Sequence, residues 1–282
     1  EAYRRIRNTL RFLLANLSDF DAKTQLLPVE QLLEIDRYAL VQAKALQARV
    51  AEVAGGNGEA LYQRYAFHHA VQELTAYCSE ELGAFYLDIL KDRLYTTGVN
   101  SAARRSAQTA LHHITHSLVQ LLAPILSFTA EEAFGWLTGN QEDSVLLHTW
   151  HEIPVVADAE ALQARWNTLR EVRSSVQKAI EEVRVSGAIG SSLQAEISIT
   201  ASADVAAVLQ ALGEDLRFVM ITSAATVQTG DSLQVSVTPS THEKCERCWH
   251  YRADVNSHAA HTGLCGRCVS NLHGEGELRQ HA

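Results

Sequence analysis

The chain has 282 residues, 46% of them hydrophobic and 20% charged, a composition that supplies real cores and is atypical of a disordered protein. Its length favours two or three domains. A formal net charge of −9 disfavours a protein that coats nucleic acid by bulk attraction, although a local basic face is compatible with it. No apolar run of about 18 residues occurs, so the sequence predicts no membrane-spanning helix.

The first residues predict an amphipathic helix. One buried seam recurs every three or four positions, through Tyr3, Ile6, Leu10, Leu13 and Leu17. Arg4, Arg7 and Arg11 lie within an arc of about 60°, roughly 110° from that seam, with Asn8 beside them. The guanidinium fork matches phosphate geometry, so these four residues are candidate phosphate contacts. The alternative is a solvated basic face.

Helical periodicity continues to about residue 140. Residues 18–21 end the first helix, and a second apolar seam, from Ile35 to Val53, ends at residues 55–58, which are Gly-Gly-Asn-Gly. Residues 61–95 are apolar over most of a helical circumference and must be covered on more than one side. They predict the central helix of a bundle, kinked near Gly83, with Lys91 and Arg93 near its end as further candidate phosphate contacts.

Two more helices complete the predicted bundle. The first runs from Ala107 to Ile125 and is bent or ended by Pro124, and a capping-box pattern at residues 129–132 opens the second. Residues 139–158 are irregular, with a short extended piece expected at residues 145–150. A long helix follows between Leu162 and Val183.

After Gly187 the hydrophobic period changes from 3.6 to 2. Strands are expected at residues 193–199, 216–221 and 233–237, with a short helix at 205–212. The predicted fold is therefore mainly α, with a helical bundle followed by a small α/β unit and a zinc knuckle. The corresponding domains are a bundle at 1–150, a linking helix at 151–189, an α/β unit at 190–240 and a metal module at 241–282.

Four of the five cysteines form a metal-binding pattern near the C-terminus. Cys245, Cys248, Cys265 and Cys268 have the spacing C-x2-C-x16-C-x2-C, in which two tight turns present four thiolates to one ion. Soft thiolates in a tetrahedral arrangement favour zinc, and four protein ligands make the site structural. A rubredoxin-like iron site and two disulfides are the alternatives. The pattern fits a reducing cytoplasm better than a disulfide framework.

Cations and aromatic residues surround these cysteines: Arg247, Trp249, Tyr251, Arg252 and Arg267. Stacking combined with phosphate contact is what a surface for single-stranded or loop RNA requires. The alternative is that Trp249 simply packs over the knuckle. No Walker loop, G-x-G-x-x-G or G-x-S-x-G motif occurs, so nothing in the sequence indicates an active site.

Several stretches resemble bacterial isoleucyl-tRNA synthetases. Residues 3–12 (YRRIRNTLRF) and 16–20 (NLSDF) resemble the start of that family's helical anticodon-binding domain, and residues 85–95 (FYLDILKDRLY) resemble its central helix. Residues 124–132 (PILSFTAEE) and 190–195 (GSSLQA) also match it, and the four-cysteine knuckle is similar to its C-terminal zinc module. These stretches span essentially the whole chain in the family's order.

The resemblance implies a parent enzyme that uses ATP to join isoleucine to its tRNA, with this chain as its C-terminal third. The H-I-G-H and K-M-S-K-S signatures of the catalytic domain are absent from the sequence, which also lacks an initiator Met. We therefore expect no ATP site and no activation, transfer or editing by this chain alone. The implied partners are isoleucine tRNA and, in cis, the catalytic and editing domains. The implied setting is a cytoplasmic monomer carrying one structural zinc ion.

The two lines of reasoning suggest a division of labour. Phosphate contacts are expected mainly on the first helix, and base contacts mainly near the knuckle. The leading alternative is a zinc-ribbon scaffold whose knuckle binds a protein. A standalone metalloenzyme is disfavoured, because four thiolates leave no open coordination position.

Overall fold

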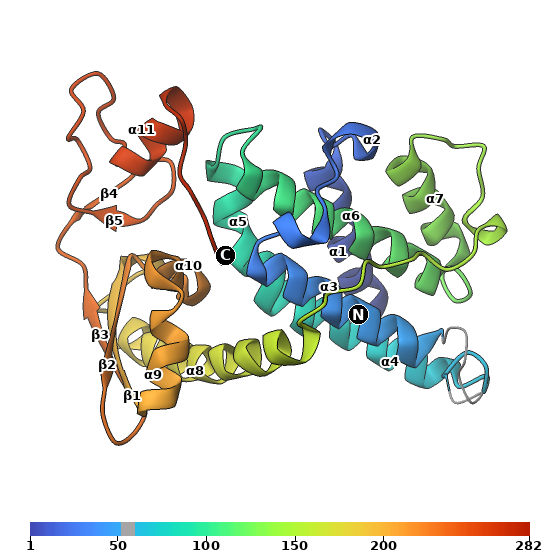
Figure 1. Ribbon diagram of the computed structural model, residues 1–282, viewed down its shortest axis with the longest axis horizontal. Coiled ribbons are helices and arrows are strands. Elements are labelled where there is room, and N and C mark those ends of the chain that lie inside the picture. The colour runs from blue at the N-terminus through green and yellow to red at the C-terminus, as the bar shows by residue number, and fades with distance from the viewer. Residues whose placement is uncertain (52–59) are drawn as a thin grey trace. The chain divides into compact units, whose positions relative to one another are not determined.

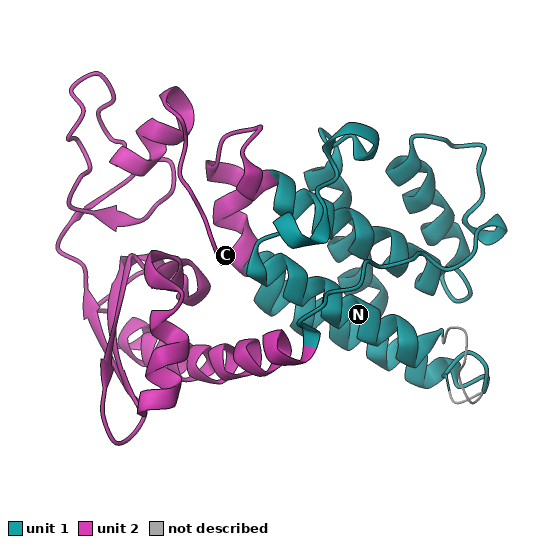
Figure 2. Cartoon of the chain, viewed as in Figure 1, with its two compact units in different colours: residues 1–88, 105–159 teal, residues 89–104, 160–282 magenta. Residues whose placement is uncertain are grey.

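A computed structural model describes residues 1–51 and 60–282, so the expected helix end at 55–58, and Val53 with it, lie outside the described residues. The chain forms two compact units (Figure 2). The helical unit comprises residues 1–88 and 105–159, and the C-terminal unit comprises residues 89–104 and 160–282. The four-domain division stays a prediction. None of the helices in the described ranges is both long and apolar enough to span a membrane.

The helical unit contains the long helices that the periodicity predicts, together with several short turns that it does not (Figure 1). They are α1 (Ala2–Leu17), α2 (Ala22–Gln25), the 3-10 turn η1 (Val29–Gln31), α3 (Glu34–Val50), α4 (Phe67–Ala76), the π-helix η2 (Tyr77–Tyr86), the start of α5 (Leu87–Thr96), most of α6 (Ala102–Leu122), α7 (Ser127–Thr138) and the 3-10 turn η3 (Val145–Leu147). Helix α6 ends two residues before Pro124, as expected from the missing N–H of proline.

The seam of α1 is buried as predicted, except at its first position. Ile6, Leu10, Leu13 and Leu17 are each less than 9% exposed, whereas Tyr3 is 48% exposed. The Tyr3 hydroxyl lies 3.3 Å from Oγ1 of Thr129 on α7. The prediction that Tyr3 belongs to the buried seam is therefore wrong: about half of its side chain is exposed and its hydroxyl contacts the Thr129 hydroxyl.

A buried carboxylate links three elements of the helical unit. Asp36, on α3, is 0% exposed. Its carboxylate accepts a hydrogen bond from the Tyr86 hydroxyl at 2.8 Å and another from the Ser106 hydroxyl. A buried polar group is costly unless it is hydrogen-bonded, so these donors help to specify how α3, η2 and α6 pack together.

The central helix differs from its prediction at its start and in its middle. It begins at Phe67, because residues 61–66 form turns in which Tyr65 has a φ of 55°. Gly83, the site of the expected kink, lies inside the ten-residue π-helix Tyr77–Tyr86. The hydrogen bonding at the end of this segment is also that of a π-helix, because the N–H of Leu87 donates to the carbonyl of Leu82, five residues earlier.

Two local predictions in the helical unit are also wrong. Helix α7 begins at Ser127, two residues before the capping-box pattern, and Leu126 is its N-cap residue without a side-chain cap. Residues 145–147 form a 3-10 turn and not an extended piece, because the Ser144 side chain accepts a hydrogen bond from the N–H of Leu146 and closes the turn.

The C-terminal unit joins a long helix to two small sheets. Its elements, besides the ends of α5 and α6, are α8 (Ala159–Val185), η4 (Ser192–Gln194), β1 (Ala195–Ala201), α9 (Ala203–Gln210), η5 (Gly213–Asp215), α10 (Leu216–Met220), β2 (Ala224–Thr229), β3 (Gln234–Pro239), β4 (Glu243–Lys244), β5 (Tyr251–Arg252) and α11 (Gly266–His273). The three-stranded sheet has the order β2-β1-β3, in which β1 is parallel to β2 and antiparallel to β3.

Strand β1 alternates buried and half-buried residues, as its sequence predicts. The predicted strand at residues 216–221 is wrong: Leu216–Met220 is helix α10, and all five of its residues are buried. A short apolar run buried all round does not distinguish helix from strand. The second strand is instead Ala224–Thr229, where small and polar residues on a half-exposed surface give almost no alternation.

Gly83→Ala tests the π-helix. In an ordinary helix this change stabilises by roughly 1 kcal/mol. Here the new Cβ would lie 3.0 Å from the backbone carbonyl oxygen of Cys78, so we expect a loss of about 1 kcal/mol in the free energy of unfolding. Chemical denaturation measures the change.

The matched control is Gly135→Ala in α7, whose Cβ would meet only the exposed side chain of Gln141. That side chain can move away, so the control should keep the normal gain. Equal stabilisation by both substitutions would contradict the steric argument.

Candidate nucleic-acid interface and metal centre

Helices α1 and α7 form an open pocket in the helical unit, here called the α1/α7 groove. Its volume is about 670 Å³. It is lined by Arg7, Asn8, Arg11, Phe12, Leu14, Ala15, Glu132 and Trp136. Three of the four candidate phosphate contacts on α1 therefore line one cavity. Arg4, the fourth, is exposed and pairs with Glu1 at 2.7 Å.

Two large aromatic side chains are exposed on α7. Trp136 is 71% exposed and Phe128 is 94% exposed, with Glu132 midway between them in sequence. Their i, i+4, i+8 spacing places all three on one face of the helix. The sequence reasoning missed this face, although the same spacing was readable there. Trp136 lines the α1/α7 groove, so its exposed ring is open to a ligand there.

Glu132 connects the aromatic face to the arginines. Its carboxylate lies 3.3 Å from Nη1 of Arg7, and this hydrogen bond raises the pKa of Arg7 further above its ordinary value. Both side chains are half-exposed, so the pair contributes little stability but orients the guanidinium. The groove thus brings two guanidinium groups and one carboxylate beside an exposed indole.

The four predicted metal ligands converge in the C-terminal unit. Cys245, Cys248, Cys265 and Cys268 are buried, and their sulfur atoms all lie within 4.8 Å of one another. None of them is in a disulfide. The backbone N–H of Cys265 donates to the sulfur of Cys245 at 3.4 Å, as is usual for a thiolate held in a tight turn. This donor set fits a tetrahedral zinc ion, and the arrangement excludes the two-disulfide alternative.

Arg267, a predicted RNA contact, points inward. Its guanidinium binds the Asp92 carboxylate in bidentate fashion, with both N···O distances 2.7 Å, and also pairs with Glu277 at 3.1 Å. Arg279 joins the same cluster, at 2.6 Å from Asp92 and 2.8 Å from Glu277. We call these four residues the Asp92 cluster. The guanidinium of Arg267 is therefore occupied by buried ion pairs within the fold, and the prediction that it contacts RNA is corrected.

Two further candidates turn out to be structural. Arg93 is 1% exposed, so its side chain cannot reach a phosphate, whereas Lys91 is exposed. Arg247 donates to the backbone carbonyls of Thr96 and Tyr95, at the C-terminal end of α5. A cation is favoured there by the helix dipole, so Arg247 holds the metal module to the end of the central helix.

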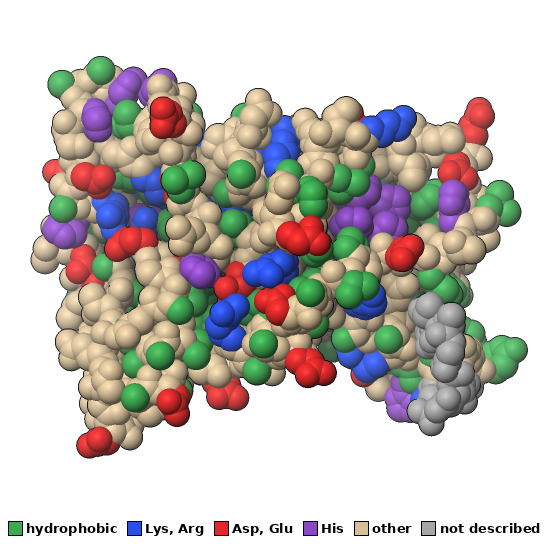
Figure 3. Space-filling model, in the orientation of Figure 1, with side chains coloured by type: hydrophobic (Ala, Val, Ile, Leu, Met, Phe, Trp, Pro, Cys, Tyr) green, Lys and Arg blue, Asp and Glu red, His purple; other side chains and the backbone are tan. Residues whose placement is uncertain are grey.

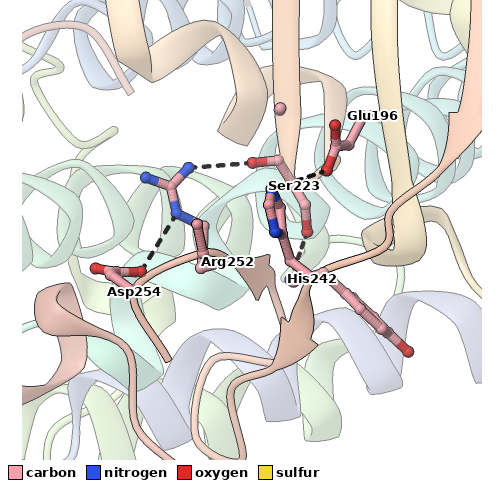
Figure 4. A pocket seen from close by; sticks show the side chains of 8 residues that line it. Glu196, Ser223, His242, Arg252 and Asp254 are labelled. Carbon is pink, nitrogen blue, oxygen red and sulfur yellow. Dashed lines mark hydrogen bonds and ion pairs between the residues drawn. The ribbon is translucent and has the colours of Figure 1, made fainter. Parts of the chain in front are cut away.

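The remaining candidates lie at the surface beside the knuckle. Trp249 is 59% exposed with a φ of 64°, so much of its ring is open to solvent, and Lys244 Nζ lies 5.3 Å from that ring. Arg252 lines a pocket of about 370 Å³ together with Glu196, Ser223, Ala224, His242, Tyr251, Ala253 and Asp254 (Figure 4). Its guanidinium lies 3.4 Å from the Ser223 carbonyl and 3.9 Å from Asp254. The pocket therefore combines a cation with carboxylates and an imidazole.

The Asp92 cluster makes a pH-dependent contribution to stability. Burial alone would raise the pKa of Asp92, but the charges of Arg267 and Arg279 and the hydrogen bond from Arg267 outweigh it and hold that pKa far below its usual value. A depressed carboxyl pKa stabilises the folded state above the unfolded-state pKa of about 3.9, and this stabilisation is lost as the pH falls through the folded-state value.

We expect Asp92→Asn to destabilise the zinc-loaded chain by about 3 kcal/mol at neutral pH, because the buried guanidinium groups of Arg267 and Arg279 then share a single carboxylate, that of Glu277. The difference from the unmodified chain should be constant above about pH 5 and shrink below about pH 4. Chemical denaturation across this range measures it. The control is Asp231→Asn, an exposed carboxylate. A pH-independent difference would contradict the electrostatic origin.

Comparison with known family models matches two parts of the chain. Residues 45–199 match the family model described as the anticodon-binding domain of tRNA ligase, and residues 243–271 match the zinc finger found in FPG and IleRS. With the four converging thiols, the second match assigns one structural zinc ion to the knuckle.

Isoleucine--tRNA ligases are similar to the chain over its entire length. Those of Janthinobacterium sp., Chromobacterium violaceum and Laribacter hongkongensis are 57%, 55% and 56% identical to it, with 100% of the chain covered. The chain spans 29–30% of the length of these relatives. It belongs to the anticodon-binding domain family of tRNA ligases and is related along its whole length to the bacterial isoleucine--tRNA ligases.

Proposed function

We propose that this chain binds the anticodon stem-loop of isoleucine tRNA, with the α1/α7 groove as its principal contact in the helical unit. The observation that carries the proposal is the juxtaposition of Arg7, Asn8 and Arg11 with exposed Trp136 in one cavity. The anticodon-binding family match and the isoleucine--tRNA ligase relatives support the same reading. The parent activity that follows is the ATP-dependent attachment of isoleucine to that tRNA.

The groove matches the chemistry of an RNA loop. Loop nucleotides are unstacked, so their bases are free to stack on aromatic side chains while guanidinium groups contact the phosphates between them. Asn8 offers both a donor and an acceptor for a base edge. Because the net charge is −9, the attraction has to come from this local arrangement and not from the molecule as a whole.

The C-terminal unit contributes a second surface in this proposal. Trp249 is available for stacking, and Arg252 lies in a pocket with His242 and Glu196, which supply hydrogen-bonding groups for a base edge. The zinc ion holds the turn that carries Trp249, because Cys248 is its immediate neighbour. Phosphate contacts on α1 and base contacts near the knuckle stay part of the proposal, and the groove adds base contacts of its own through Trp136 and Asn8. A cytoplasmic monomer, with catalytic and editing domains in cis, completes the proposal.

Arg7→Ala combined with Arg11→Ala tests the phosphate contacts. Binding of isoleucine tRNA to the zinc-loaded chain should weaken, and the slope of log affinity against log salt should fall by about one for each arginine that neutralises a phosphate. Fluorescence titration at several salt concentrations gives both quantities.

The matched control is Arg49→Ala. Arg49 forms an exposed ion pair with Glu73 at 3.2 Å, much like the pair of Arg7 with Glu132 at 3.3 Å, but it lies on α3. An equal loss of tRNA affinity in the control would show that the effect comes from the overall charge of the chain and not from the groove. If the chain binds neither isoleucine tRNA nor any other tRNA saturably at low salt, the proposed function is wrong and a protein-binding scaffold is favoured.

Trp136→Ala tests stacking separately from charge. Loss of a stacked base costs about 1–3 kcal/mol, so affinity should fall by about 5- to 150-fold while the salt slope stays unchanged. Trp136→Phe keeps a π face and should retain most of the affinity. The comparison of isoleucine tRNA with a non-cognate tRNA then shows whether the stacked position contributes to discrimination. A Phe variant as weak as the Ala variant would contradict the stacking role.

A further inference from the structure

Four histidines form a cluster in the helical unit that the proposed tRNA contacts do not use. Helix α6 carries His112, His113 and His116, and the segment after η3 carries His151. Figure 3 shows histidine side chains gathered into one patch near α6. All four are half-buried, so they are reachable from solvent without being free side chains on a flat surface.

The segment that carries His151 is held firmly against α6. The N–H of His151 donates to the side-chain oxygen of Gln120, and the amide of Gln120 donates to the carbonyl of Thr149 at 2.8 Å. The carbonyl of His151 accepts a hydrogen bond from Gln47 Nε2 at 3.0 Å. These backbone contacts fix the position of His151 independently of its ring, which is the preorganisation that a binding site requires.

The rings lie at separations that suit one shared ion. The centroid of His116 is 4.5 Å from that of His112 and 4.9 Å from that of His151. His113 and His151 are 5.1 Å apart, with Nδ1 of the first 2.8 Å from Nε2 of the second, and His112 is 5.5 Å from His113 and 6.3 Å from His151. Zinc–nitrogen bonds of about 2.0–2.1 Å in a tetrahedral site place two ligating imidazoles about 5 Å apart, centroid to centroid.

The cluster also keeps its imidazoles in the form that binds metals. Burial, together with the neighbouring imidazoles, lowers the pKa of His112 to about 4 and of His113 and His116 to about 3, and burial lowers that of His151. The rings are therefore neutral at pH 7, and neutral imidazole nitrogen is the ligand of zinc, copper and nickel. The i, i+4 spacing of His112 and His116 puts two of them on one helix face.

We propose that His112, His113, His116 and His151 form a second metal site, for a borderline transition-metal ion such as Zn²⁺ held by imidazole nitrogens. Ion binding replaces the His113–His151 hydrogen bond and requires the rings to turn. Among the described residues, only the knuckle cysteines bring three or more ligand atoms within 4.8 Å of one another. The nitrogen atoms of the four histidines are therefore not yet gathered around one point, and the rings have to rotate to bind an ion. Half-exposed rings have the freedom for that rotation. The site is independent of tRNA binding and of the knuckle.

Calorimetric titration with Zn²⁺ tests the site. The probe is added to the chain whose knuckle already holds one zinc ion. We expect a second ion to bind, and His112→Gln combined with His116→Gln to abolish that second binding while the first ion stays. The matched control is His68→Gln with His69→Gln, a neighbouring pair whose rings are 4.0 Å apart on α4, and it should bind the second ion normally.

A measurement on the unmodified chain guards against a variant that fails to fold. Bound Zn²⁺ should protect the four histidines from acylation by diethyl pyrocarbonate, as mapped by mass spectrometry, and leave His68 and His69 reactive. A chain that binds only one zinc ion, or a second ion lost equally in the control variant, would overturn the proposal. Unchanged acylation of the four histidines on addition of zinc would also overturn it.

Discussion

The buried carboxylate of Asp92 is the interaction on which the C-terminal unit depends. It joins the central helix to residues 175 and 187 positions later in the chain, through Arg267 and Arg279. The metal module has little apolar core, since its buried cluster consists of the four cysteines with Val255 and Leu264 packed against them. Without a large hydrophobic contribution, its attachment rests on ionic contacts and its internal fold rests on the metal.

The arginines of the chain fall into two groups, those that hold the fold together and those that are available to a ligand. Arg93, Arg247 and Arg267 act within the fold, whereas Arg7, Asn8 and Arg11 line an open groove and Arg252 lines a second pocket. A chain with a net charge of −9 has to attract RNA through such local surfaces. In the proposed function, the aromatic face of α7 adds sequence-tolerant stacking to charge, which is the combination that recognition of an RNA loop uses.

Periodicity predicted the long elements well and the short ones poorly. The buried seam of α1, the helices around it and the alternation of β1 follow directly from apolar spacing, because one face of each is buried. Helix α10 was taken for a strand because five consecutive buried residues have no period at all. The π-helix was also beyond local reasoning, since it adds a residue per turn without changing which residue types are apolar.

The sequence by itself determined the zinc ligands and the arginine stripe of α1, because the spacing of both is local and their chemistry belongs to the residue types. Tertiary structure decided which way the other cations point, since the partner of Arg267 is a carboxylate 175 residues away. It likewise decided that Trp136 faces the arginines of α1 and that His151 joins three histidines of α6. Such contacts arise only when distant segments pack together, and no local pattern of residues encodes them.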